Sequence, residues 1–131
     1  MTIVVGFIPT PEGEAALSAA ITEAQRREEP LHIINSSPGD ALADRRFASE
    51  DAVDALRSRL AETGLVYEVK QLVRGREASE ELVDAADRLG ASMIVIGIRR
   101  RTATGKLITG SQAQRILLDA NCPVLAVKAS S

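Results

Sequence analysis

The sequence has very few aromatic residues and a single cysteine, and both shortages exclude classes of function. Phe, Trp and Tyr together make up 2% of the 131 residues. Proteins that bind single-stranded nucleic acid stack the bases on aromatic side chains, so this composition argues against binding of single-stranded nucleic acid. One thiol, Cys122, cannot form an intrachain disulfide or a cysteine-based metal cluster, which suits a reducing cytoplasm. We therefore expect a cytoplasmic protein that does not bind nucleic acid.

Long apolar runs and an excess of positive charge are also missing. No apolar run approaches the roughly 20 residues of a membrane-spanning helix, and residues 1–6 lack the basic and apolar regions of a signal peptide. The net charge is −2 and the pI is about 5.5, so no overall basic field attracts DNA or anionic membranes. We expect a soluble protein without membrane contact, in which residues 1–131 form one domain.

Short β-branched segments predict five strands that are buried on both faces of a sheet. They are Ile3–Phe7, Leu31–Asn35, Val66–Val73, Met93–Gly97 and Val124–Val127. The intervening segments carry apolar residues at every third or fourth position, which predicts four helices. Strands that alternate with helices are typical of right-handed βαβ units in a mainly parallel sheet. The sequence thus predicts an α/β fold.

Helix boundaries are marked by capping residues and glycines. Thr10 followed by Pro11 predicts an N-cap and the first residue of a helix. Gly64 and Gly90 stand where helices are expected to end. The longest irregular segment, residues 36–47, contains Pro and Gly as well as four charges, and we expect a solvated surface loop there.

The segment from Gly97 to Ser111 joins the fourth predicted strand to the fourth predicted helix and holds most of the chemistry. It contains four cationic residues, three glycines and several hydroxyl groups. In an open parallel sheet, ligands bind beyond the carboxyl ends of the strands where the strand order reverses, and the turn at residues 8–10 should meet this segment there. Backbone N–H groups, a helix N-terminus and cations can all point at one phosphate. We predict a phosphate-binding loop.

Simpler interpretations of the same residues stay open. Ser111 and Gln114 fit the capping box S-x-x-Q, so Ser111 is expected to cap the fourth helix, with or without a phosphate contact. Each arginine of residues 99–101, taken alone, fits a solvated basic turn. The P-loop motif is absent, because Arg100 stands where it needs glycine and Leu107 where it needs Ser or Thr.

The spacing of Gly97, Gly110 and Ser111 resembles the signature of the universal stress protein family, G-x-x-G followed by nine residues and G-[ST]. Arg100 replaces the second glycine. The segments VVGF at residues 4–7, GASMIVIG at 90–97 and CPVLAV at 122–127 are similar to the first, fourth and last strands of that family. The resemblance covers essentially the whole chain, with the elements in the same order.

The resemblance implies a three-layer open sandwich with a five-stranded parallel sheet of order 3-2-1-4-5 and four helices on both faces. It implies a regulatory protein of the stress response that binds ATP, ADP or AMP, with adenine near the first two strands and phosphates on the glycine loop. It also implies a homodimer through the last strand, residues Val124, Leu125, Ala126 and Val127. The nucleotide-binding residues that we expect are Thr10, Gly97, Arg99, Arg100, Lys106, Gly110 and Ser111.

Two departures from the family pattern define the alternatives. Ile8 stands where the family's nucleotide binders usually carry an acid, so we expect only weak dependence on Mg²⁺. Arg100 would either clamp a phosphate or obstruct the site. If Ile8 and Arg100 mark a lost site, the chain is instead a nucleotide-free dimeric interaction protein. We expect no enzyme, although a weak ATPase is a distant third interpretation, because His32 lies in a strand and Cys122 precedes a buried one.

Overall fold

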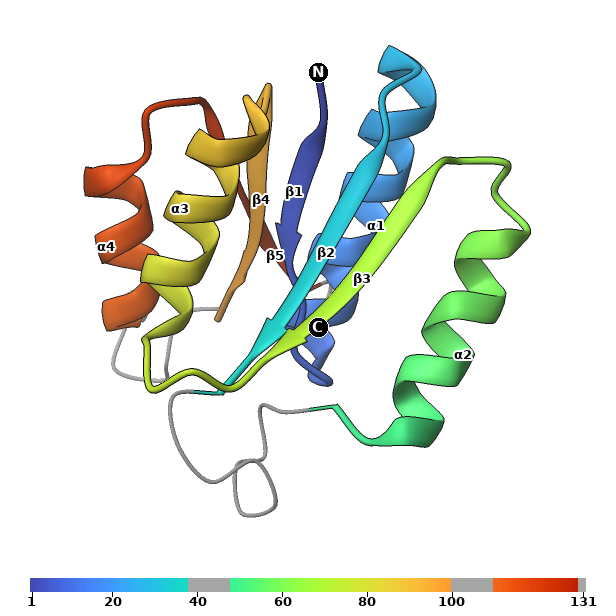
Figure 1. Ribbon diagram of the computed structural model, residues 1–131, viewed down its shortest axis with the longest axis horizontal. Coiled ribbons are helices and arrows are strands. Elements are labelled where there is room, and N and C mark those ends of the chain that lie inside the picture. The colour runs from blue at the N-terminus through green and yellow to red at the C-terminus, as the bar shows by residue number, and fades with distance from the viewer. Residues whose placement is uncertain (38–47, 100–109, 130–131) are drawn as a thin grey trace.

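The computed structural model describes residues 1–37, 48–99 and 110–129 (Figure 1). Strands and helices alternate along this part of the chain. In order they are β1 (Ile3–Gly6), α1 (Pro11–Arg27), β2 (Leu31–Ser36), α2 (Glu50–Ala61), β3 (Tyr67–Leu72), α3 (Ala78–Leu89), β4 (Met93–Ile98), α4 (Ser111–Asp119) and β5 (Val124–Lys128). Each predicted strand end lies within one residue of the observed end.

All five strands are parallel and form one sheet of order β3-β2-β1-β4-β5, which confirms the expected topology. The first strand lies at the centre, where Ile3 pairs with Leu31 on one side and with Met93 on the other. The strand order therefore reverses between β1 and β4. Ligands of open parallel sheets bind at such a reversal, beyond the carboxyl ends of the strands.

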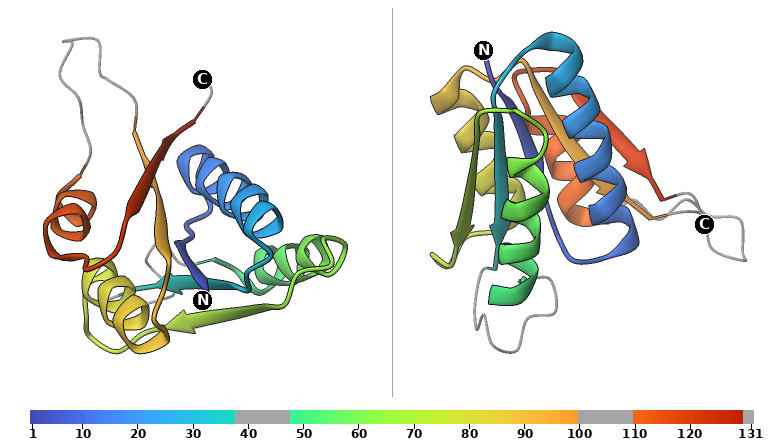
Figure 2. Two further views of the ribbon diagram at one scale, coloured as in Figure 1. Left: turned by 90° about the horizontal axis from the view of Figure 1, so that it is seen from above. Right: turned by 90° about the vertical axis from the view of Figure 1, so that its right-hand side faces the viewer.

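Helices cover both faces of the sheet, in three layers (Figure 2). Alternate residues of β1 point to opposite faces. Val5 belongs to a buried cluster formed with α1 and α2, and Val4 to a second cluster formed with α3 and α4. We call these the α1–α2 face and the α3–α4 face.

Capping was predicted correctly for α1 and wrongly for α4. The hydroxyl oxygen of Thr10 accepts the N–H of Gly13 at 3.1 Å, with Pro11 as the first helical residue. In α4, Gly110 and not Ser111 is the N-cap, and Ser111 is already helical. The reason is the backbone of Gly110, at φ 83° and ψ 154°, a region open essentially to glycine alone. It turns the chain into the helix one residue earlier than a serine cap would.

The segment after β2 does not begin as a solvated loop. Ser36 is the last residue of β2, and Ser37 is buried with its N–H bonded to the carbonyl oxygen of Leu72 at 2.9 Å. The prediction rested on the Pro, the Gly and the charges of the segment, and all of these come after its first two residues, where Ser36 ends an interior strand and Ser37 is buried. Residues 38–47 lie outside the described residues. A membrane-spanning helix is not found anywhere in the described part of the chain.

Candidate functional site

A pocket of about 570 Å³ opens at the carboxyl ends of β1, β2 and β4, where the strand order reverses. Its floor is formed by strand residues such as Gly6, Ile96 and Gly97. On the α3–α4 face it is walled by Leu82 of α3 and by the first turn of α4. The start of α1 closes the other side. The volume is in the range of roughly 300–1,000 Å³ that is usual for small-molecule sites.

Gly6 and Gly97 in the pocket floor are both positions where a side chain would collide with a neighbour. A Cβ atom at Gly97 would lie 2.1 Å from the carbonyl oxygen of Glu12, in the first turn of α1. A Cβ atom at Gly6 would lie 2.7 Å from a methyl group of Leu82. The neighbour of Gly97 is a backbone atom, whereas the neighbour of Gly6 is the end of a side chain. Gly97 therefore lets α1 pack against the end of β4, a role that its place in the signature did not suggest.

The N-terminus of α4 differs from those of the other three helices. Their first turns carry acidic residues, whereas α4 has none there and its N-cap, Gly110, has no side chain to accept a hydrogen bond. The first N–H groups of a helix carry partial positive charge and need acceptors. Gly110, Ser111 and Gln112 line the pocket. This wall of the pocket is therefore electrostatically suited to an anion.

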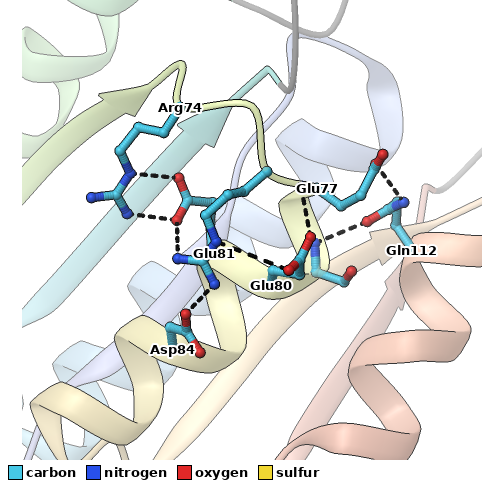
Figure 3. A network of polar contacts seen from close by, with 8 residues as sticks. Arg74, Glu77, Glu80, Glu81, Asp84 and Gln112 are labelled. Atoms are coloured by element: carbon cyan, nitrogen blue, oxygen red, sulfur yellow. Dashed lines mark hydrogen bonds and ion pairs between the residues drawn. The ribbon is translucent and has the colours of Figure 1, made fainter.

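Gln112 links α4 to the N-terminus of α3 (Figure 3). Its side-chain oxygen accepts the backbone N–H of Ser79 at 2.9 Å, and its amide donates to Glu77 Oε2 at 2.9 Å. At the other end of α4, the Asn121 amide donates to the Asp87 carboxylate of α3 at 3.1 Å. Three hydrogen bonds, made by Gln112 and Asn121, thus fix the position of α4 on α3, and with it the position of the pocket wall at the start of α4.

A buried carboxylate anchors α3 in turn. Glu81 has 1% of its side chain exposed, and its oxygens accept hydrogen bonds from Arg74 at 2.5 and 3.0 Å and from Arg76 at 3.1 Å (Figure 3). Arg76 also pairs with Asp84. A buried charge needs such partners, because an unpaired carboxylate in the interior is strongly destabilising. The arginines hold the loop before α3 against that helix, so they contribute to the pocket wall indirectly.

On the α1 side, the pocket is lined by Thr10, Glu12 and Arg99. Thr10 uses its hydroxyl oxygen as the cap of α1, which leaves the O–H hydrogen to donate. Glu12 has 15% of its side chain exposed and lies 3.7 Å from Arg99 Nε, while the Arg99 side chain is 74% exposed. This side of the pocket therefore holds a carboxylate, a cation and a hydroxyl.

The structure brings five of the predicted site residues together around the pocket. They are Thr10, Gly97, Arg99, Gly110 and Ser111. The other two, Arg100 and Lys106, lie in residues 100–109, outside the described residues. In the described part of the chain, no three His, Cys, Asp or Glu side chains gather as a metal site would require.

Three polar side chains of the pocket lining were missed from the sequence. Glu12 was not among the predicted site residues, and Ser36 was placed in a solvated loop. Gln112 follows Ser111, and the capping pattern pointed to Gln114 instead. For Glu12 a signal existed: a helix that starts directly after the first strand of an open sheet presents its first turn to the ligand crevice.

Comparisons with known proteins give one consistent answer. Residues 1–128 match the model of the universal stress protein family. A universal stress protein of Mycolicibacterium smegmatis is 47% identical over 126 residues, which cover 96% of both chains. The solved structure of an Archaeoglobus fulgidus universal stress protein matches with a TM-score of 0.82 at 37% identity, covering 98% of each chain. A second structure from that organism, of a universal stress protein in complex with dAMP, matches at 30% identity with a TM-score of 0.67, also covering 98% of each chain. The chain belongs to the universal stress protein family.

Proposed function

We propose that this protein binds an adenine nucleotide in the pocket between β1 and β4 and acts as a regulatory protein of the stress response. The observation that carries the proposal is the bare N-terminus of α4, which opens into a pocket of about 570 Å³ at the reversal of strand order. The related A. fulgidus protein in complex with dAMP supports an adenine nucleotide as the ligand.

The pocket offers a separate environment to each part of such a ligand. Ile34, Leu82 and Ile116 form an apolar wall on the α3–α4 face that suits the base. The first N–H groups of α4 and the Ser111 hydroxyl suit a phosphate. Arg99, Arg100 and Lys106 supply the cations that neutralise it in our proposal. Glu12 is the one carboxylate in the described lining, so a Mg²⁺ ion would be held mainly by phosphate oxygens.

Calorimetric titration with AMP, ADP and ATP, with and without Mg²⁺, tests this proposal. Gly110→Val should abolish binding, because a β-branched residue cannot keep the backbone that presents the α4 N–H groups. Gly64→Val is the matched control: Gly64 also has positive φ, an added Cβ there would meet no atom within 4 Å, and it lies outside the pocket lining. Gly64→Val should bind as the wild type does. Binding that survives in Gly110→Val would place the nucleotide elsewhere.

A substitution of Arg100 tests whether its side chain binds the phosphate or obstructs the pocket. Arg100→Ala should weaken binding roughly ten- to a hundred-fold if the guanidinium donates to phosphate, and should strengthen binding if it blocks the pocket. Mass spectrometry of the native protein would reveal a co-purifying nucleotide. An empty protein that gives no heat at millimolar ATP would contradict nucleotide binding and favour the nucleotide-free interaction protein.

We further propose that the regulatory form is a homodimer through β5. The two edge strands of the sheet differ: β3 exposes Glu68 and Lys70, whereas Val124–Val127 of β5 are apolar and only half-buried. Charged residues on an edge discourage strand pairing, and an uncharged apolar edge invites it. Leu125→Lys should give monomers by light scattering. Val66→Lys, at the exposed position before β3, should leave the dimer intact, and a wild-type monomer at micromolar concentration would refute the proposal.

A further inference from the structure

Glu12 is a carboxylate inside the pocket that neither the family signature nor the sequence pattern assigns. It comes from the first turn of α1 and is 15% exposed. Its described partner is Arg99, at an N–O distance of 3.7 Å, which is too long for a hydrogen bond. Arg99 is itself mostly exposed, and an exposed ion pair of this kind holds its members only weakly. With respect to the described residues, the Glu12 oxygens therefore keep their capacity to accept hydrogen bonds from a ligand.

The place of Glu12 in the pocket limits which ligand group can reach it. The backbone of Glu12 packs against Gly97 at the end of β4, on the α1 side of the sheet. The anion-binding wall, at Gly110 and Ser111, belongs to the α3–α4 side. A phosphate is attracted to the helix N-terminus and repelled by a carboxylate. Of the groups of a nucleotide itself, the one that contacts Glu12 is therefore an uncharged hydrogen-bond donor.

In an adenine nucleotide such donors are the sugar hydroxyls and the amino group of the base. The apolar wall formed by Ile34, Leu82 and Ile116 lies on the α3–α4 side, as the anion-binding wall does. If the base lies on the apolar wall and the phosphate on the anion-binding wall, the sugar lies between them and presents its hydroxyls to the α1 side of the pocket. That side is where Glu12 lies. Two adjacent hydroxyls can each donate to one oxygen of a carboxylate, in charge-assisted hydrogen bonds.

We propose that Glu12 binds the 2′,3′-diol of the sugar and makes this pocket selective for ribonucleotides over 2′-deoxyribonucleotides. The inference rests on the proposed nucleotide site and adds its sugar specificity. Removal of the 2′-hydroxyl leaves one acceptor of a partly buried carboxylate without its donor. The expected preference for AMP over dAMP is roughly tenfold, the ratio that one charge-assisted hydrogen bond gives.

Titration of AMP and dAMP into three proteins in the presence of EDTA tests the inference. The proteins are the wild type, Glu12→Ala and the matched control Glu14→Ala. Glu14 is also an acid of the first turn of α1 and also pairs with an arginine, Arg59, but it lies outside the pocket lining. Both substitutions remove one negative charge near the helix N-terminus. The ratio of the two affinities cancels any effect of that charge on phosphate binding, because both ligands carry the same phosphate.

The expected result is a preference of roughly tenfold for AMP in the wild type and in Glu14→Ala, falling below about twofold in Glu12→Ala. Equal affinities for AMP and dAMP in the wild type would overturn the sugar specificity and leave the nucleotide site standing. A preference that persists in Glu12→Ala, or disappears equally in Glu14→Ala, would also overturn it. If the wild type binds neither ligand, both the sugar specificity and the proposed function are wrong.

Discussion

Replacement of Gly97 by alanine tests whether this signature glycine serves the fold. The added Cβ would lie 2.1 Å from the carbonyl oxygen of Glu12 and 2.6 Å from its carbonyl carbon. Both atoms belong to the backbone of a helix whose cap and first turn are fixed by Thr10 and Pro11, so they cannot move aside cheaply. Overpacking of this kind destabilises a protein by about 1–3 kcal/mol. With about 3–5 °C of Tm lost per kcal/mol in a domain of this size, Tm should fall by about 3–15 °C.

Gly6→Ala is the matched control for Gly97→Ala. Gly6 also lies in a strand of the pocket floor, but its added Cβ would meet a methyl group of Leu82 at 2.7 Å, with the next atom at 3.5 Å. A side-chain end can change rotamer, so Gly6→Ala should lose clearly less stability than Gly97→Ala. Thermal unfolding of the two ligand-free variants, followed by circular dichroism, measures the difference. Equal Tm values for Gly97→Ala and the wild type would refute the packing role.

Two further predictions concern titratable groups. Burial lowers the pKa of His32, although the negative charge of Glu68 acts in the opposite direction, so the folded state favours the neutral imidazole. The contribution of His32 to the free energy of unfolding should therefore be fully present above about pH 6.5 and should be lost as the pH falls below that value. Denaturant unfolding between pH 5 and pH 8 should show this loss in the wild type and much less of it in His32→Val. Burial, and secondarily the charge of Asp87, raises the pKa of the Cys122 thiol, which should therefore react slowly with a disulfide reagent in native buffer at neutral pH; immediate stoichiometric labelling would contradict this.

The fold could be predicted from the sequence because its signals are local and redundant. The strand Ile3–Gly6 begins with three β-branched residues, and Thr10 with Pro11 starts α1 by stereochemistry that does not depend on distant contacts. The order of the strands in the sheet is not signalled locally. It follows from long-range pairing, and it was obtained from the family resemblance and not from periodicity.

The candidate site could be located but not resolved from the sequence. The described ends of the segment after β4, at Gly97 and at Gly110, line the pocket, and the segment was singled out because its glycines and hydroxyls are concentrated in one stretch. Its phosphate-binding role stays a prediction. Glu12 and Ser36 reach the same pocket from two other places in the chain, and Gln112 reaches it from the position directly after the segment. Each has a simple local interpretation, and only the folded chain shows that these side chains share one cavity.

The structure also separates what the signature residues do for the fold from what they do for a ligand. Gly97 has to be glycine because a side chain there would collide with the backbone of Glu12, and Gly110 because its φ is positive. Both reasons hold whether or not a nucleotide binds. Their presence therefore does not distinguish a nucleotide-binding protein from a nucleotide-free one of the same fold. The discriminating features are those that the fold does not need: an α4 N-terminus whose cap offers no side-chain acceptor, and the weakly paired carboxylate of Glu12 inside the pocket. Since neither contributes much to stability, substitutions at Glu12 should change ligand affinity far more than Tm, whereas Gly97→Ala should do the reverse.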